Sequence, residues 1–563
     1  MRKKLLLAMV FALIVSACSG GATVGPEGST DTPTAQDVGT LKMNAGDPST
    51  LDPAFCGDTG CAAFVSEIYS GLFRPMLRWQ VNESPGVVAR CPEGTDDEDI
   101  CLVADISVDF GTKTVNADDT VTYVFDIRQD VYFHNGRQLT AADVKWSWER
   151  AANPSLGSST FELYLTDIVG AWDRFRRRTD EISGVQVIDD FTLSVTIDGD
   201  KPFWLWNLAY PTTFVVDMNQ ADPVKGIPNW TANPNGTGPF KLDEYIPGHR
   251  LILVRNDNYY LRDVTLERAI FNLAGGSTLT KYEAGELNVA GIGLADIDRV
   301  RNPNDPLNAD LVEGRNEIGT FYIGFNMDDA TMQDDNLRKA LAASVQRELI
   351  ASVILKNAVV PAYSFTPPGM PDYAPPIEAT QRYDIALAKE LLAQSDYDGT
   401  PLRLTVSGQG ANTSDWIQSV VETWRTELGV EVIIEQAGDF QTYQRDLKQG
   451  NLQMFVVGWI ADYPDPYDFL DLKLHGDRSA ANNEVRYDNP EFDALLELAQ
   501  TEQDVQTRMA LYLEAERILL EDVPVIVMFH GKNALLKKSN VEGFRTQPMV
   551  MPRLGFVTVH PVK

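Results

Sequence analysis

The sequence is poor in the residues that usually hold metals, with five histidines and five cysteines among 563 residues. No histidine stands close to a cysteine in the sequence, and the spacings of Cys56 to Cys61 and of Cys91 to Cys101 are not CxxC. Structural zinc sites rely on such spacings. We therefore expect the protein to bind no metal and no cofactor.

Two familiar signatures of hydrolases are also missing, since the chain contains neither GxSxG nor HExxH. His134, Asn135 and Asp143 lie close together and resemble a catalytic group at first sight. No nucleophile with a neighbouring base accompanies them, so a strand, turn and helix start is the better interpretation. The 80 acidic residues leave a paired-carboxylate site open, but we predict a protein that is not an enzyme and has no catalytic residues.

Positive charge is scarce, because 48 lysines and arginines face 80 acidic residues and the net charge is −32. A chain of this charge is repelled by nucleic acid and by anionic lipid, so we expect no nucleic-acid partner. The excess of acidic residues indicates either binding of cationic solutes or only a solvated acidic surface. The second case is the commoner one.

Long apolar runs are limited to one, residues 5–15, which is too short to cross a bilayer as a helix. Arg2, Lys3 and Lys4 precede it, which is the pattern of a secretory signal. Val15-Ser16-Ala17-Cys18 resembles a bacterial lipobox, which implies a diacylglyceryl group on Cys18; an ordinary signal peptide with a chance cysteine is the alternative. We predict a signal peptide at 1–17 and a flexible tether, rich in Gly, Ser, Thr and Pro, at 18–38.

Export and anchoring place the protein on the outer face of the cytoplasmic membrane, at the cell surface or in the periplasm, with the lipid as its only membrane contact. The four cysteines beyond Cys18 then form disulfides, as is usual in exported chains. Three connectivities are possible, and we favour the local one, Cys56 with Cys61 and Cys91 with Cys101, over zinc binding.

Strand-like and helix-like segments alternate along the rest of the chain, which is typical of mixed α/β domains. Residues 122–128 (TYVFDIR) alternate as a half-buried strand does, and Thr140 with Asp143 predicts a capped helix start. A hairpin is expected around residues 246–249. Other predicted strands are 322–325, 403–406, 430–434 and 523–529, and other predicted helices are 337–354, 385–394, 415–428 and 505–520. The order around 403–434 suggests a βαβ unit.

Seven blocks occur in the same order as in one known family. They are residues 48–53 (PSTLDP), 69–72 (YSGL), 133–144 (FHNGRQLTAADV), 236–240 (GTGPF), 325–326 (FN), 337–341 (LRKAL) and 458–466 (GWIADYPDP). They resemble the dipeptide/oligopeptide/nickel-binding class of ABC transporter solute-binding proteins, the bacterial extracellular solute-binding protein family 5. Each block is weak by itself, and their collinear order over residues 41–545 is what identifies the family.

The resemblance implies a two-lobed clamp of the periplasmic-binding-protein kind, in which mixed β-sheets are flanked by helices and two crossing segments act as a hinge. Lobe I is expected at 39–324, with an inserted subdomain near 71–205. Lobe II is expected at 325–525, and 526–563 return to lobe I. The protein is expected to be a monomer that works with the permease subunits of an importer.

The resemblance also assigns binding residues. In peptide-binding members, an aspartate three residues after the tryptophan pairs with the α-ammonium of the peptide, and Trp459 and Asp462 keep that spacing. The alternative for Asp462 is a loop residue that caps a turn, and Trp459 is equally a candidate core residue. Gly458 and Ala461 are expected to expose backbone groups to the ligand, and Tyr463 completes the set.

Ala54 and Phe55 occupy a loop that lines the cleft in relatives, although Cys56 in the same loop departs from the family pattern. Phe161 corresponds to an aromatic residue that faces the cleft. For the peptide carboxylate the sequence leaves Arg338, Arg347, His475 and Arg478 open, the first two being more typical of a helix surface.

The sequence therefore predicts an exported solute receptor that captures a small peptide for an ABC importer. The same clamp holding an oligosaccharide, an opine-like compound or a nickel chelate is the alternative, because a fold does not determine its ligand. Nickel ranks last, since only His249, His475 and His530 lie outside the 133–144 block and the terminus.

Overall fold

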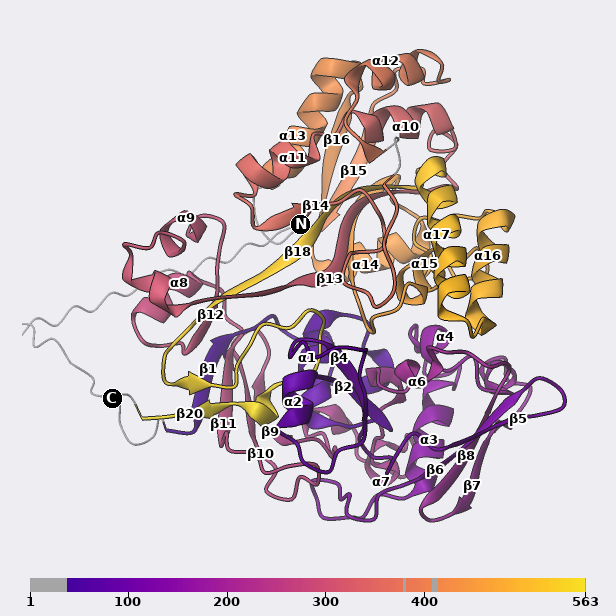
Figure 1. Cartoon of the computed structure of the whole chain (residues 1–563), viewed down its shortest axis with the longest axis vertical. Helices are drawn as coiled ribbons and strands as arrows, with labels where there is room; N and C mark the ends of the chain where they lie inside the picture. Colours follow the sequence, from indigo (N-terminus) through magenta and orange to yellow (C-terminus); the bar gives the residue numbers. More distant parts are fainter. Residues whose placement is uncertain (1–37, 378–380, 408–413, 562–563) are drawn as a thin grey trace, which may run out of the picture.

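Two lobes lie one above the other and are joined by long strands that run between them (Figure 1). The structure is a computed structural model, and it describes residues 38–377, 381–407 and 414–561. The predicted signal peptide, Cys18 and the tether as far as residue 37 lie outside the described residues. Among the described residues, no helix is both long and apolar enough to span a membrane.

One 11-stranded sheet passes through both lobes. Its order is β16 (Val432–Ala437), β15 (Leu402–Ser407), β17 (Met454–Ile460), β13 (Leu311–Phe325), β18 (Val525–Lys537), β12 (Val289–Gly291), β1 (Thr40–Asn44), β11 (Arg268–Asn272), β10 (Arg250–Arg255) and β9 (Phe240–Ile246), with β14 (Val359–Pro361) paired to β18. Strands β13 and β18, of 15 and 13 residues, pair antiparallel and connect the two lobes. Their register shifts at Glu313/Asn316 and Asn316/Thr320, so the pairing is irregular where the chain crosses.

The lower lobe carries three smaller sheets and short helices. The sheets consist of β2 (Phe73–Leu77), β4 (Ile100–Ala104) and β3 (Ala89–Arg90); of β5 (Thr112–Val115), β6 (Val121–Asp126), β8 (Thr192–Ile197) and β7 (Val185–Asp189); and of β19 (Val541–Glu542) and β20 (Thr558–Val559). The helices of this part are α1 (Thr59–Ile68), α2 (Arg78–Asn82), α3 (Ala141–Ala151), α4 (Phe161–Tyr164), α5 (Ala171–Phe175), α6 (Trp204–Asn207), α7 (Met218–Ala221), α8 (Thr278–Glu283) and α9 (Ile297–Val300).

Helices cover the upper lobe on both sides of its strands (Figure 1). They are α10 (Asp335–Ala343), α11 (Arg347–Leu349), α12 (Ile385–Ala393), α13 (Asp415–Thr423), α14 (Phe440–Gln449), α15 (Tyr467–Leu474), α16 (Pro490–Thr501) and α17 (Val505–Asp522). Strands β15 and β16 are parallel with α13 between them in sequence, which confirms the predicted βαβ unit. The two-lobed mixed α/β architecture is the predicted fold class.

Several local predictions are confirmed. Residues 122–126 of the predicted strand 122–128 fall in β6, and β9 with β10 form the predicted hairpin. Helix α3 begins as expected, because Asp143 accepts the backbone amide of Thr140 at 3.0 Å. The predicted helix 337–354 is wrong as one element, since α10 ends at Ala343. The break lets the Arg347 side chain reach the carbonyl of Val527 on β18, at 2.6 Å.

The large core cluster at the meeting of the lobes draws on both of them. It contains Tyr164, Phe203 and Tyr210 from the lower lobe together with Tyr463 and Tyr467 from the upper lobe. The rings of Phe203 and Tyr467 stack with their centroids 3.7 Å apart. The lobes are therefore in direct contact around the candidate site.

Candidate functional site

Strand β17 presents an open edge toward the meeting of the lobes. Its sequence, MFVVGWI, is rich in β-branched and aromatic residues that favour strands. On one side it pairs along its whole length with β13, whereas on the other side β15 pairs only with Met454 and Phe455. The Ala461 amide donates to the carbonyl of Ile318 at 2.7 Å. Because backbone groups alternate along an antiparallel strand, those of Gly458 and Ile460 point to the open edge.

Asp462 stands just beyond this edge and faces a small cavity. The cavity, of about 20 Å³, is lined by residues of both lobes, including Ser66, Arg74, Tyr210, Phe214 and Asp462. The hydroxyl of Tyr164 donates to Oδ2 of Asp462 across the boundary between the lobes. A cavity of this size holds about one water molecule. The lobes must therefore separate before a larger ligand enters.

The electrostatics of Asp462 favour a cation in that cavity. Burial raises the pKa of its carboxyl to about 7, against the opposing effects of the Tyr164 hydroxyl and the charge of Lys473. Arg74 lines the same cavity, but its guanidinium is bound to Asp105 at 2.6 Å, and Lys473 is bound to Glu484 at 2.7 Å. Within the described residues, Asp462 thus has no ion-pair partner of its own.

A second carboxyl group, that of Asp468, orients the first. Its Oδ2 accepts the backbone amide of Asp462 at 3.0 Å and the indole N–H of Trp459 at 3.3 Å. Asp468 is fully buried, and burial together with the nearby charge of Asp462 raises its pKa well above the usual range. We infer that Asp468 positions the turn after β17 and the ring of Trp459, over which the Lys473 ammonium lies at 4.4 Å.

The raised pKa of Asp462 predicts a pH-dependent effect on stability. A carboxyl whose pKa is higher in the folded state than in the unfolded state stabilises the fold only when protonated. Its stabilising contribution therefore falls as the pH rises from about 4 to about 7 and stays lost above that. The variant Asp462→Asn should therefore melt above the wild type at pH 8 without ligand, by about 1 °C for each kcal/mol of this contribution in a chain of this length.

This advantage should shrink when both proteins are melted at pH 4.5, where the wild-type carboxyl is protonated. Thermal unfolding of the two proteins between pH 4.5 and pH 8 measures it. A difference in melting temperature that is the same at every pH would contradict the raised pKa of Asp462.

The other predicted residues of the 458–463 stretch divide into two groups. Gly458 and Trp459 are partly exposed on the open edge. Ala461 and Tyr463 are buried, at 1% and 0% exposure, and Ala461 uses its amide within the sheet. Tyr463 packs with Phe203, with ring centroids 6.5 Å apart. Both residues are therefore engaged inside the protein and not at the open edge.

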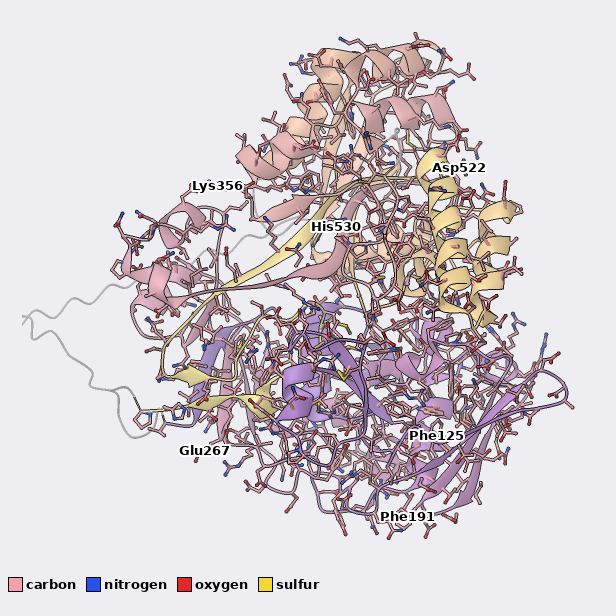
Figure 2. The ribbon with its side chains drawn as sticks, in the orientation of Figure 1. Phe125, Phe191, Glu267, Lys356, Asp522 and His530 are labelled. Carbon is pink, nitrogen blue, oxygen red and sulfur yellow. A yellow bond between two sulfur atoms is a disulfide. The ribbon has the colours of Figure 1, made fainter. Side chains whose placement is uncertain are left out.

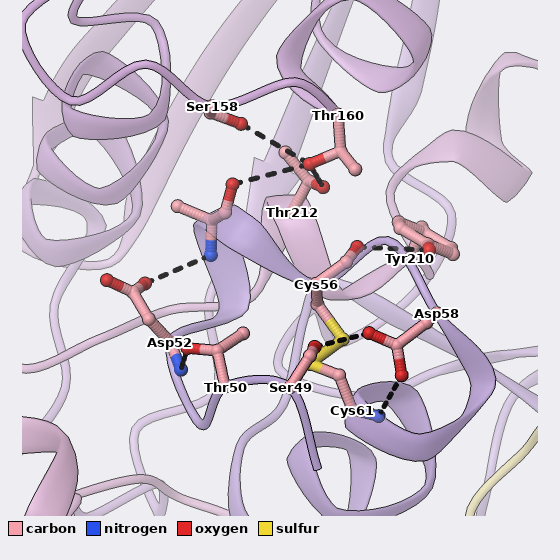
Figure 3. The surroundings of a disulfide bond; sticks show 11 residues. Ser49, Thr50, Asp52, Cys56, Asp58, Cys61, Ser158, Thr160, Tyr210 and Thr212 are labelled. Atoms are coloured by element: carbon pink, nitrogen blue, oxygen red, sulfur yellow. Dashed lines mark hydrogen bonds between the residues drawn. A yellow bond between two sulfur atoms is a disulfide. The ribbon is translucent and has the colours of Figure 1, made fainter. Parts of the chain in front are cut away.

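The 54–56 loop does not line a cleft in the way that the family resemblance implies (Figure 3). Ala54 is 3% exposed, its amide is bound to Asp52 and its carbonyl to the hydroxyl of Thr160. The carbonyl of Cys56 accepts the hydroxyl of Tyr210 at 3.1 Å. These backbone groups are satisfied inside the protein, so only the side chain of Phe55, 38% exposed, remains available for contact.

The disulfide beside this loop joins Cys56 to Cys61 at the start of α1 (Figure 3). A second disulfide joins Cys91 to Cys101. Both follow the local connectivity. Since the first ties the loop to the helix that carries Ala62 and Ser66, it holds one wall of the cavity in place.

Phe161 does not face the cleft, and that expectation is corrected. Its side chain is fully buried and stacks on Phe175 with ring centroids 4.8 Å apart, inside the lower lobe. Tyr164, three residues later, reaches Asp462 instead. About one helical turn separates the two residues, so the sequence pointed to the right helix but to the wrong residue on it.

The residues considered for a ligand carboxylate are all engaged by the protein. Arg338 and Arg347, expected at a helix surface, are instead each 1% exposed and bind backbone carbonyls of Val523 and Val527. Arg478 is paired with Asp471, and His475 is 6% exposed. They hold the upper lobe together, which corrects the expectation that Arg338 and Arg347 are surface residues.

Two of the histidines considered for nickel are engaged elsewhere. His530 on β18 lies where the strand leaves the upper lobe (Figure 2), 3% exposed, with Nδ1 3.0 Å from the carbonyl oxygen of Gly319. Burial lowers the pKa of its imidazole to about 4. His475 lies 3.8 Å from Asp493. Neither lines the cavity at Asp462.

Four residues of the site were missed by the sequence: Arg74, Tyr164, Tyr210 and Asp468. Tyr210 and Arg74 come from remote parts of the lower lobe and have no motif of their own. Asp468 follows Asp462 by six residues but lies two positions beyond the 458–466 block, so the block gave no signal for it.

Glu162 of α4, two residues before Tyr164, also joins the lobes. Its carboxylate accepts the Ser479 amide at 2.9 Å and the Asn482 side-chain amide at 2.6 Å, and it also binds the Ser479 hydroxyl. These bonds link residues that are more than 300 positions apart in sequence. They hold the two lobes together beside Tyr164.

Comparison with known proteins gives consistent results. Residues 109–481 match the family model described as bacterial extracellular solute-binding proteins, family 5 middle. The chain is 26% identical to the oligopeptide-binding protein OppA of Bacillus subtilis over 98% of this chain and 97% of that protein.

Two solved structures share the fold. The murein tripeptide binding protein MppA of Escherichia coli superimposes with a TM-score of 0.78 at 22% identity, covering 92% of this chain and 98% of MppA. Haemophilus influenzae OppA, in complex with the peptide RPPGFSPFR, gives a TM-score of 0.77 at 20% identity, covering 93% and 99% of the two chains.

Proposed function

The chain belongs to the bacterial extracellular solute-binding proteins of family 5, and we propose that it captures a small peptide between its lobes for delivery to an ABC importer. The observation that carries this proposal is the open edge of β17, which ends at the carboxylate of Asp462. An extended peptide adds to such an edge through its backbone. Relatives and structural neighbours that bind peptides support the same ligand class.

In this proposal, each part of the site has a distinct role. The ammonium of the peptide binds the Asp462 carboxylate through a charge-assisted hydrogen bond, and it displaces the proton that burial favours there. The backbone of the first residues pairs with Gly458 and Ile460. Trp459, held by Asp468, forms an adjoining apolar wall.

Capture and release require the lobes to move about β13 and β18. We place lobe I at 39–324 and 526–563 and lobe II at 325–525, which puts both boundaries at the upper ends of these strands. The register shifts between the two strands, from Glu313 to Tyr322, support bending within the part of the strands that connects the lobes. With the lobes closed, Tyr164 and Glu162 of one lobe contact Asp462 and Ser479 of the other.

We also propose that Cys18 carries a lipid that holds the protein on the outer face of the membrane. The support is the signal-like sequence 1–17, which ends in Val15-Ser16-Ala17-Cys18, and the composition of the following tether. Partition of the exported protein into a detergent phase tests the anchor. Recovery in the aqueous phase would contradict it.

A thermal-shift screen tests the ligand class. Ligand that binds only the folded state raises its stability by about 2.7 kcal/mol at a hundredfold excess over Kd. We expect this for tri- to pentapeptides, with a clear rise in melting temperature, and no comparable rise for oligosaccharides or nickel salts. A library of peptides that leaves the melting temperature unchanged, with a shift for a sugar or for nickel, would replace the peptide by that solute.

A further inference from the structure

A second and larger cavity, of about 300 Å³, adjoins the candidate site. It lies between the lower lobe and the strands β13 and β18, where the C-terminal segment passes α1 (Figure 1). Its apolar lining includes Met43, Phe64, Phe271, Leu535, Met549 and Met551. Methionine and phenylalanine side chains of this kind accept apolar groups of varied shape.

The two cavities share a wall. Ala62 and Ser66 of α1 line the small cavity, whereas Ala63 and Glu67, one position further along, line the larger one. Val550 lines both. A side chain of a ligand held at Asp462 therefore lies within reach of the second cavity.

Glu317 connects the second cavity to the candidate site along β13. It precedes Ile318, whose carbonyl accepts the amide of Ala461, so Glu317 falls next to Asp462 in the register of the two strands. Glu317 lines the cavity, and burial alone raises the pKa of its carboxyl, with no cation contributing. The group is thus a partly buried acid without a charge partner among the described residues.

Glu67 adds a second acidic atom to the same cavity. The residue is 3% exposed, and its Oε1 accepts the amides of Arg553 at 2.7 Å and Leu554 at 2.9 Å. Its Oε2 is buried and has no hydrogen-bond partner in the structure. A buried carboxylate oxygen left in this way is costly unless something fills the site.

Arg553 is the one cation among the residues that line this cavity. Its guanidinium lies over the ring of Phe544, 4.5 Å from the centroid, and its charge partly offsets that of Glu67. Two carboxyl groups against one guanidinium leave the cavity acidic. A net charge of −32 on the whole chain adds a field that attracts cations.

From this lining we infer that the second cavity takes a lysine or arginine side chain of the bound peptide, with the alkyl stem against Met43, Met549 and Phe271 and the cationic end at Glu317 and Oε2 of Glu67. Long basic side chains bury their stems on apolar surface and keep the charge at a polar end. The inference rests on the proposed function, and it adds a preference for basic peptides to it.

The test uses the purified protein and nine tripeptides on a trialanine frame. Lysine, norleucine or glutamate replaces one alanine at each of the three positions, and calorimetry measures the Kd of each peptide and of trialanine. Norleucine keeps the alkyl stem without the charge. At one position, we expect lysine to bind about tenfold or more tighter than norleucine, in line with hydrogen bonds to charged groups, and glutamate to bind weakest.

The variant Glu317→Gln should reduce the advantage of lysine over norleucine to less than about threefold, while trialanine binds as before. Glu313→Gln is the matched control, because Glu313 lies on the same strand but is 55% exposed and paired with Arg301 at 3.3 Å. It should leave the advantage intact.

Suppose that trialanine binds, and that the lysine and norleucine peptides bind equally tightly at all three positions. That result would overturn the inference and leave the proposed function standing. An advantage that persists in a folded Glu317→Gln variant would also overturn it. No binding of any peptide would instead overturn the proposed function, and with it the inference. The comparison of lysine with norleucine in the wild type decides the matter even if the variant does not fold.

Discussion

Asp462→Asn is expected to weaken peptide binding by about 2–5 kcal/mol, or roughly thirtyfold to several thousandfold in Kd. The substitution keeps the size of the side chain and removes the charge that faces the small cavity. Asp462 has no ion-pair partner among the described residues, so the ligand ammonium is the group that its carboxylate would pair with. Calorimetry with the tightest peptide from the thermal-shift screen measures the loss.

Two controls separate this role from a general effect of charge. Asp257→Asn removes a carboxylate that is 76% exposed and paired with Arg255, and it should leave the affinity unchanged. An N-acetylated peptide has no ammonium, so it should bind the wild type about as weakly as the free peptide binds Asp462→Asn. When the acetylated peptide is measured with the Asp462→Asn variant, the two losses of affinity should not add, because both changes remove the same interaction. Unchanged affinity in Asp462→Asn would remove Asp462 from the site.

Gly236→Ala is expected to destabilise the protein by about 3 kcal/mol or more, the upper part of the range for forcing atoms into a packed interior. A Cβ at this position would lie 1.9 Å from the carbonyl oxygen of Ile68 and 2.7 Å from its carbonyl carbon. Both are backbone atoms at the end of α1, so no side chain can rotate away. The 236–240 turn is held there by the bond from the Gly238 amide to the Ile68 carbonyl, at 2.9 Å.

The clash should also lower ligand affinity, because α1 carries Ser66 of the small cavity and Glu67 of the larger one. Gly438→Ala is the control, since no atom lies within 4 Å of its Cβ position. Thermal and urea unfolding measure both variants. If Gly236→Ala melts within one degree of the wild type, the contact with Ile68 is not close in solution.

Local structure followed closely from the sequence. The hairpin of β9 and β10, the capped start of α3 and the parallel pair β15 and β16 each depend on residues that are near one another in the chain. The 458–466 block likewise led to Asp462, because the spacing from Trp459 is a local property. The predicted helix 337–354 failed where a remote contact, from Arg347 to Val527, competes with helical periodicity.

The site depended far more on tertiary packing. Tyr164 and Tyr210 stack with ring centroids 3.9 Å apart, although 46 positions separate them in the printed sequence. Tyr164 then meets Asp462 across the two lobes. Which residue of α4 meets Asp462 was decided by the packing of Phe161 against Phe175 inside the lower lobe. Periodicity in a helix of four residues could not distinguish Phe161 from Tyr164, because residues three apart lie on the same face.

By itself, the sequence determined the family, the alternation of elements and the carboxylate at Asp462, because collinear blocks and local spacings are written directly in the chain. Only the tertiary structure decided what surrounds that carboxylate. The open edge of β17 exists because β15 stops pairing at Phe455. The acidic cavity exists because Glu67 and Glu317, 250 residues apart in the sequence, line the same space between the lower lobe and the strands β13 and β18. Burial raises the pKa of both acids, and the charge of Arg553 offsets that of Glu67 only in part; both effects exist only in the folded protein.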